Sequence, residues 1–155
     1  MEWKIKKFED LTVFELYEIL KAREEIFIVE QNCIYHDLDS NDQSSTHLFL
    51  ENEGQVVCYL RILPRGVKYE EASVGRVITN ASYRRKGYGE ILVQKAIDFV
   101  EEVWGEREIR ISAQAHLRGF YGGLGFKVVS DVYLEDGIDH YEMLYTGRAD
   151  AMPFS

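Results

Sequence analysis

The feature that most constrains the fold of this chain is a short basic, glycine-rich turn, Arg84–Gly89, with the sequence RRKGYG. A largely apolar run at 74–78 comes before it, and a run with helical spacing from Ile91 to Trp104 follows it. A glycine-rich turn between a strand and a helix gathers backbone N–H groups at the positive end of the helix dipole. The sequence therefore predicts an anion-binding site at this turn, held by a fold that mixes strands and helices.

The overall charge of the chain restricts its partners. A formal net charge of −9 argues against non-specific binding to nucleic acid or to an anionic membrane. The cluster Arg84–Lys86 has the opposite sign and points to an anionic ligand, although a solvated basic turn would have the same sequence. Neither a signal peptide nor an apolar stretch of membrane-spanning length is evident, so a cytoplasmic protein is expected.

Length and patterning predict one domain. A chain of 155 residues with 46% apolar residues can bury one core, so we expect a single domain over residues 1–155 with a loose tail at 146–155. Strands are predicted where apolar residues alternate or run together between turn signals, at 3–8, 47–51, 56–63, 72–79, 108–113, 126–129 and 140–145.

Helices are predicted at three places. Thr12 and Glu15 form a capping-box pattern, which begins a helix that runs towards Val29. A second helix is expected at 91–104 and a short third one at 116–124, where two glycines weaken it. This order indicates an α+β fold, with one mostly antiparallel, twisted sheet of about six to seven strands and helices on both faces.

No metal site is expected. The two cysteines provide neither a metal site nor a disulfide framework. Asp37, Asp39 and Asn41 match the first three ligand positions of a calcium loop. The match then fails, because Asp42 stands where the turn needs glycine and Leu48 stands where a glutamate should close the site.

Two common nucleotide-binding turns are excluded. The dinucleotide fingerprint Gly-x-Gly-x-x-Gly fails because Gly87 and Gly89 are followed by Leu92. The sequence also lacks the Gly-Lys-Ser/Thr of a phosphate-binding loop. What remains is Arg84-x-x-Gly87-x-Gly89 between a strand and a helix.

This pattern resembles the acetyl-CoA signature Gln/Arg-x-x-Gly-x-Gly/Ala of the GNAT N-acetyltransferase family. The segment Phe120–Phe126 resembles the Tyr-x-x-x-Gly-Phe motif of that family, and both motifs lie in the family's order and separation. A narrower resemblance, to the ElaA-type branch, covers most of the chain. It rests on Glu30-Gln31-x-Cys33-x-Tyr35, Asp39, Asp42, His47, Gly75-Arg76-Val77, Ala113-Gln114 and Glu135-Asp136-Gly137-Ile138-x-His140. Two departures are Gln114, where many GNAT members carry Asn, and Ile34, where proline is common in the branch.

The resemblance implies an N-acetyltransferase of a GNAT-like fold. It would transfer the acetyl group of acetyl-CoA to a primary amine, on a small molecule or a peptide, by direct attack through a tetrahedral intermediate. Acetyl-CoA would be the cosubstrate, without a metal, and the chain could form a homodimer. The strand end Val77, Ile78 and Thr79 would pair with the pantetheine arm, and the turn would hold the pyrophosphate through Arg84, Arg85, Lys86, Gly87, Tyr88, Gly89 and Glu90.

The resemblance also suggests acid and base residues. Tyr121 resembles the tyrosine that protonates the leaving sulfur, although its spacing from Leu117 and Leu124 also suits a core aromatic residue. Gln114 could position substrate or water. The base stays open between Glu30, Glu135, His140 and a water chain to a carboxylate.

The acidic residues before the second predicted strand could have either of two roles. Asp37, Asp39 and Asp42, together with Glu30, could attract a cationic amine, or the three aspartates could belong to a solvated loop. His47 is as consistent with a structural hydrogen bond as with catalysis.

Two other functions stay open. One is a non-catalytic module that senses acetyl-CoA or CoA, and the other is a phosphate-binding interaction domain with a coincidental turn. Tyr121 favours an enzyme over a sensor, because a protein that only binds CoA needs no acid at the sulfur.

Overall fold

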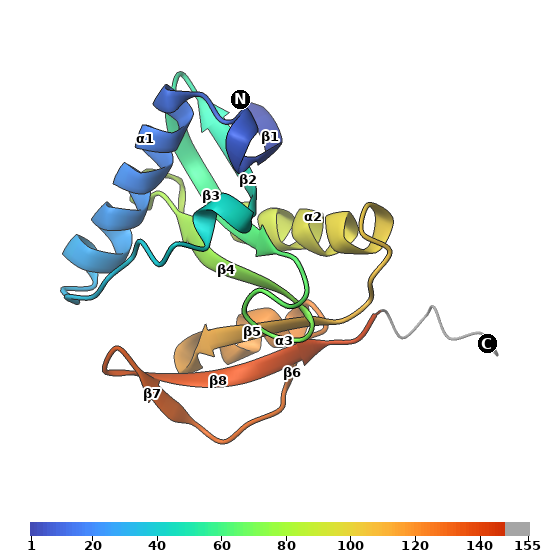
Figure 1. The fold of residues 1–155 in the computed structure, drawn as a ribbon. Helices are drawn as coiled ribbons and strands as arrows, with labels where there is room; N and C mark the ends of the chain where they lie inside the picture. The colour runs from blue at the N-terminus through green and yellow to red at the C-terminus, as the bar shows by residue number, and fades with distance from the viewer. Residues whose placement is uncertain (148–155) are drawn as a thin grey trace.

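The structure is a computed structural model that describes residues 1–147, so almost all of the tail predicted at 146–155 lies outside the described residues. One sheet has its strands in the order β1-β2-β3-β4-β5-β8-β6, with β7 paired to β8 (Figure 1). The strands are β1 (Glu2–Lys7), β2 (Thr46–Asn52), β3 (Gln55–Leu63), β4 (Ala72–Thr79), β5 (Ile109–Gln114), β6 (Lys127–Val128), β7 (Tyr133–Glu135) and β8 (Ile138–Tyr145). Only β4 and β5 pair in parallel within residues 1–147, which confirms the α+β class and the mostly antiparallel sheet.

The helices are α1 (Val13–Arg23), α2 (Tyr88–Glu102) and α3 (Arg118–Gly123). The predicted capping box begins α1, where the Thr12 hydroxyl accepts from the Glu15 N–H at 3.0 Å and the Glu15 carboxylate accepts from the Thr12 N–H at 2.9 Å. From Glu24 to Glu30 the chain is π-helical, where the sequence predicts a continuation of one α-helix. Within residues 1–147, no helix has the length and apolar character needed to cross a membrane.

The two long helices cover opposite faces of the sheet, as predicted (Figure 1). On one face, Ile19 of α1 packs with Phe49 and Tyr59. On the other, the apolar side of α2 packs in a cluster with Leu48 and Leu60. β2 and β3 are almost wholly buried. Successive strand residues point to opposite faces, and both strands supply apolar side chains to the clusters on the two faces.

The short strand β7 is not predicted by the sequence patterns, so the sheet has eight strands instead of six to seven. It joins β8 through Asp136 and Gly137, which both have positive φ angles, of 52° and 77°. Asp-Gly is a typical hairpin signal, but three residues before it are too few to show an alternating pattern.

β4 and β5 are paired only where they begin. The register joins Ala72 to Ile109 and Ser73 to Arg110, and no later pair follows in the described part of the chain. β4 stays paired with β3, and β5 stays paired with β8 to its end. The sheet therefore divides into two halves that spread apart (Figure 1), and one edge of β4 has unpaired backbone groups from Val74 onward.

Candidate active site

Two cavities lie at the opening between β4 and β5. The larger, of about 760 Å³, lies beside the end of β4 and the start of α2, and its volume suits a small-molecule site. The smaller, of about 110 Å³, lies beside the middle of β4 and the β7–β8 hairpin. Val77, Gln114 and Tyr121 line both cavities, so the two cavities adjoin at these residues.

The glycine-rich turn borders the larger cavity with its backbone. None of the N–H groups from Arg85 to Glu90 donates to a backbone carbonyl within residues 1–147. Gly87 precedes α2 with φ of 83°, a conformation that favours glycine, and α2 begins three residues earlier than the sequence pattern predicts. Free N–H groups and the positive end of a helix together make a site that fits a pyrophosphate.

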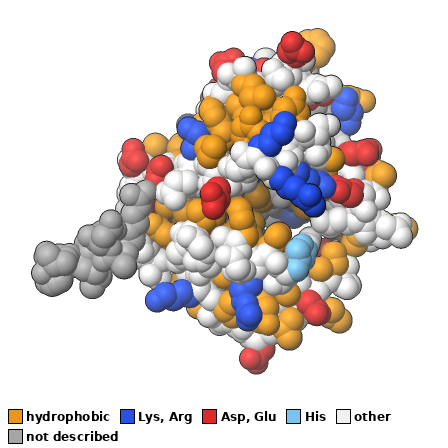
Figure 2. All heavy atoms as spheres, turned by 180° about the vertical axis from the view of Figure 1, so that it is seen from behind, with side chains coloured by type: hydrophobic (Ala, Val, Ile, Leu, Met, Phe, Trp, Pro, Cys, Tyr) orange, Lys and Arg blue, Asp and Glu red, His pale blue; other side chains and the backbone are white. Residues whose placement is uncertain are grey.

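Positive side chains gather near this cavity. Seen from the side opposite to Figure 1, Lys and Arg side chains lie beside a hollow in the middle of the molecule (Figure 2). Arg84 and Arg85 line the larger cavity, together with Thr79, Tyr88 and the neighbouring residues Ile78, Gly87, Gly89 and Glu90. Lys86 does not line it in the described structure, and its ammonium lies 5.7 Å from the centre of the Tyr83 ring.

A β-bulge interrupts β4 where this strand borders both cavities. The register pairs Tyr59 with Ile78 and Arg61 with Gly75, so Arg76 and Val77 lie opposite the single residue Leu60. Arg76 has φ of 54°, which is uncommon for a residue other than glycine. The bulge interrupts the regular ladder between β3 and β4 at Arg76 and Val77, and both of these residues line the smaller cavity.

Tyr121 lies on α3 at the junction of the cavities. Its side chain is 6% exposed and its ring packs edge-on against Phe120 and Phe126. No hydrogen-bond partner of its hydroxyl is found among the described residues. Burial raises the pKa of the Tyr121 hydroxyl above its ordinary value, so this group is protonated at neutral pH.

Glu135 and His140 lie together in the smaller cavity. The Glu135 carboxylate accepts from the Ser112 hydroxyl at 3.0 Å, and its other oxygen lies 3.5 Å from His140 Nε2. His140 Nδ1 lies 2.7 Å from the Ile138 carbonyl, which can only accept, so Nδ1 carries a proton. The Nε2 atom is therefore the one that can gain or lose a proton within the cavity.

Glu30, the third base candidate, lies at the larger cavity instead. Its two oxygens accept from Arg84 Nη1 and Nη2 at 2.5 and 2.6 Å. These hydrogen bonds hold the pKa of the Glu30 carboxyl below its usual range. Gln114, by contrast, lines both cavities, and its side-chain amide donates to the Gln31 side chain in a long hydrogen bond of 3.4 Å, the one side-chain hydrogen bond found for it within residues 1–147.

The Glu30–Arg84 pair leads to a testable prediction. In Glu30→Gln, Arg84 is free to meet a phosphate and a nearby negative charge is lost, so we expect the Kd for acetyl-CoA to fall about threefold at low salt. We expect kcat to change less than about threefold, since a carboxylate held ionised by arginine is a weak base. Calorimetry and steady-state kinetics measure the two constants, and a loss of kcat above about a hundredfold would instead identify Glu30 as the base.

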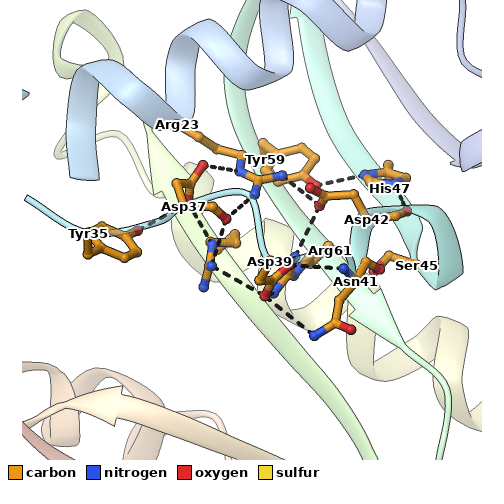
Figure 3. Close-up of polar contacts among 11 residues, drawn as sticks. Arg23, Tyr35, Asp37, Asp39, Asn41, Asp42, Ser45, His47, Tyr59 and Arg61 are labelled. Atoms are coloured by element: carbon orange, nitrogen blue, oxygen red, sulfur yellow. Dashed lines mark hydrogen bonds and ion pairs between the residues drawn. The ribbon is translucent and has the colours of Figure 1, made fainter. Parts of the chain in front are cut away.

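The acidic segment 37–42 is neither a solvated loop nor free to attract an amine. Its three aspartates, Asp37, Asp39 and Asp42, are paired with three arginines, Arg23, Arg61 and Arg76 (Figure 3). Burial alone would raise the pKa values of the carboxyls of Asp39 and Asp42, but the arginines hold them below their usual range.

His47 also proves to be structural. It is fully buried, with Nδ1 2.7 Å from the Tyr59 hydroxyl and Nε2 2.9 Å from the Asp42 carbonyl (Figure 3). Burial lowers the pKa of its imidazole, so the ring is neutral inside the protein.

No site role was predicted for four residues that line the smaller cavity, namely Gln31, Cys33, Tyr35 and Ser112, although the first three belong to the ElaA-like pattern. Cys33 and Tyr35 are half-buried and alternate in the sequence with the exposed residues Ile34 and His36. Such alternation is typical of an extended segment with one side against the protein, and it could have indicated their placement.

Comparisons with known proteins agree with this architecture. The acetyltransferase (GNAT) domain family matches residues 17–146. A UPF0039 protein of Synechocystis is 38% identical over 146 residues, which cover 94% of this chain and 95% of the relative.

Solved structures give the same result. An acyl-CoA N-acyltransferase from Pseudomonas aeruginosa superposes with a TM-score of 0.88 at 37% identity, covering 94% of this chain and 99% of that chain. Escherichia coli ElaA superposes with a TM-score of 0.87 at 35% identity, covering 93% and 98%. This chain therefore belongs to the GNAT acetyltransferase family, among the relatives of ElaA.

Proposed function

We propose that this protein transfers the acetyl group of acetyl-CoA to a primary amine. The observation that carries the proposal is the pair of cavities that adjoin at Val77, Gln114 and Tyr121. One cavity has an anion-binding turn, and the other has a carboxylate and an imidazole. The relative from Pseudomonas aeruginosa, named as an acyl-CoA N-acyltransferase, supports an acyl-CoA donor.

The donor fits the larger cavity and the open edge of β4. The pantetheine amides would bond to the unpaired backbone of Val77–Thr79, in the way that a peptide adds to a sheet edge. The pyrophosphate would accept from the free N–H groups of Arg85–Glu90. This placement brings the thioester to the bulge, between Val77 and Tyr121.

The reaction then needs one proton removed and one supplied. The neutral amine attacks the carbonyl carbon, a C–N bond forms, and the negative oxygen of the tetrahedral intermediate accepts from the Val77 N–H. The C–S bond breaks as the Tyr121 hydroxyl donates its proton to the sulfur. The base of the smaller cavity makes the amine neutral by taking one proton from the bound ammonium before the attack, and the extra proton that the nitrogen carries after the attack returns to the Tyr121 oxygen.

The smaller cavity suits an unbranched primary amine. Its volume is only about 110 Å³, and the acidic residues Glu135 and Asp136 are among those that line it. Among residues 1–147, the one arginine that lines it is Arg76, which is already paired with Asp37 and Asp39. An alkylammonium is thus attracted, whereas an amine with an adjacent carboxylate would meet like charges.

His140 is our preferred base, with Glu135 beside it. The fixed proton on Nδ1 leaves Nε2 to receive a proton, and the Glu135 carboxylate at 3.5 Å stabilises the resulting imidazolium. Glu30 lies at the donor cavity and is held by Arg84, which removes it from the acceptor side.

A pH profile tests this assignment. In His140→Gln we expect kcat/KM to fall about tenfold at pH 7, with the loss shrinking as the pH rises, because more of the amine is then already neutral. A loss that stays constant between pH 7 and pH 10 would show that the imidazole is not the base. His116→Gln, at an exposed position of the donor cavity, serves as the control.

A thiol-release screen with acetyl-CoA and a panel of amines tests the function as a whole. Diamines and unbranched monoamines are expected to release CoA, and α-amino acids are not. A sensor would show thermal stabilisation by CoA but no thiol release, and an interaction domain with a coincidental turn would show neither.

A further inference from the structure

We propose that Arg76 is a positioning residue that holds one wall of the smaller cavity against the β4 bulge. This wall is formed by residues 33–39, and we call it the acceptor wall. The inference rests on the proposed function for its meaning in catalysis, but the contacts that support it are independent of that function.

The acceptor wall lacks the usual means of being held in place. Residues 34–40 take part in no backbone–backbone hydrogen bond found among residues 1–147. Apolar packing is weak as well, because Ile34 and Leu38 are 98% and 62% exposed. Its inward side chains, Cys33 and Tyr35, line the smaller cavity, so the position of the wall sets the shape of that cavity.

Side-chain contacts to arginines hold the wall instead (Figure 3). Arg76 Nε lies 2.7 Å from Asp37 Oδ1, and Arg76 Nη2 donates to the Asp37 carbonyl at 2.9 Å. Its guanidinium also lies over the Tyr35 ring at 5.8 Å, and the Tyr35 hydroxyl donates to Asp37 at 3.1 Å. One arginine therefore contacts both an inward residue of the wall and its backbone.

The other two arginines anchor the far end of the segment. Arg23 and Arg61 are 0% and 1% exposed, and both donate to Asp42, at 2.7 and 3.1 Å. Arg61 also binds Asp39 through both of its terminal nitrogens. Both guanidiniums are charged and buried, and each depends on these carboxylates for its partners, so these two arginines are structural.

Arg76 differs from them in its place. It lies in the bulge itself and lines the smaller cavity. Its φ of 54° would be easier for glycine, so an arginine here retains backbone strain while its side chain binds the wall. The residue thus joins the strand that would meet the thioester to the wall that would meet the amine.

The backbone strain allows a sharp test. Arg76→Gly favours the same positive φ and preserves the bulge, but it removes every contact to the wall. We expect the KM for the amine to rise about tenfold, with the Kd for acetyl-CoA within about twofold of the unaltered protein. Arg76→Lys keeps the charge but cannot form the same paired contacts, so its KM for the amine should lie between those of the unaltered protein and of Arg76→Gly.

NMR relaxation gives a readout that does not depend on turnover. Arg76→Gly should lower the backbone order parameters of residues 33–39 below about 0.6, while those of β3 stay at about 0.85. Asp37→Asn should give the same pattern, and adding it to Arg76→Gly should produce little further change. Unchanged order parameters in 33–39 would overturn the proposal, whereas lowered ones in a protein without turnover would uphold the positioning role of Arg76 and reject the acetyltransferase assignment.

Discussion

Gly87→Asp is expected to weaken acetyl-CoA binding by at least about a hundredfold, a loss of at least about 2.7 kcal/mol of binding free energy. The substitution places a carboxylate among N–H groups that have no other acceptor in the described structure. Two like charges separated by a few ångströms cost several kcal/mol near a protein surface. Titration calorimetry with acetyl-CoA and with CoA measures the change.

A matched control separates charge from backbone strain. Gly87 and Gly54 have φ angles of 83° and 80°, and at both positions an added Cβ would meet no atom within 4 Å. Gly54 lies in the turn between β2 and β3, away from both cavities. Gly54→Asp should therefore cost similar stability in thermal unfolding but leave the Kd unchanged. If both variants bind acetyl-CoA normally, the turn is not the phosphate site.

The donor side could be foreseen because its signals are local. The glycines at 87 and 89, the strand before them and the helix after them lie within one continuous stretch of sequence. Backbone N–H groups in such a stretch converge through short-range geometry alone. The capping box at Thr12 and Glu15 is predictable for the same reason.

The acceptor side could not be foreseen in the same way. Asp37 binds Arg23, 14 residues away, and Arg76, 39 residues away, so no local pattern links them. The sequence of the segment 37–42 shows its carboxylates but not their partners. A solvated loop and a site that attracts an amine are therefore both consistent with it. The short β7 and the bulge at Arg76 likewise depend on pairing between distant strands.

One useful signal was nevertheless present. Arg61 and Arg76 interrupt runs that are otherwise largely apolar, inside strands that the pattern predicts to be buried. A charge in such a place needs a partner of the opposite sign, and the nearest rich source is the segment 37–42. Ion pairs between these arginines and the aspartates of the segment could thus have been predicted, but the sequence does not tell which aspartate pairs with which arginine.

The second large effect is expected from Tyr121→Phe, which should lower kcat about a hundredfold and leave the Kd for acetyl-CoA within about twofold. The sequence allows two roles for this residue, a core aromatic residue or the acid at the sulfur. Its burial and its contacts with Phe120 and Phe126 satisfy the first role, and its place at both cavities satisfies the second.

The substitution separates these roles because phenylalanine keeps the ring and its packing. No partner of the hydroxyl is found in residues 1–147, so its removal leaves no buried polar group unpaired and stability should hardly change. Tyr145→Phe is the control, since that ring also packs against Phe126 but lines neither cavity.

The pH dependence gives a second, independent criterion. Because burial raises the pKa of the Tyr121 hydroxyl above 10, loss of its proton should lower kcat only at still higher pH, and activity should hold throughout the neutral range. Tyr121→Phe should lower the whole profile without moving its acidic limb. If the Phe variant keeps full activity, Tyr121 is a core residue and the sulfur leaves as a thiolate without its help.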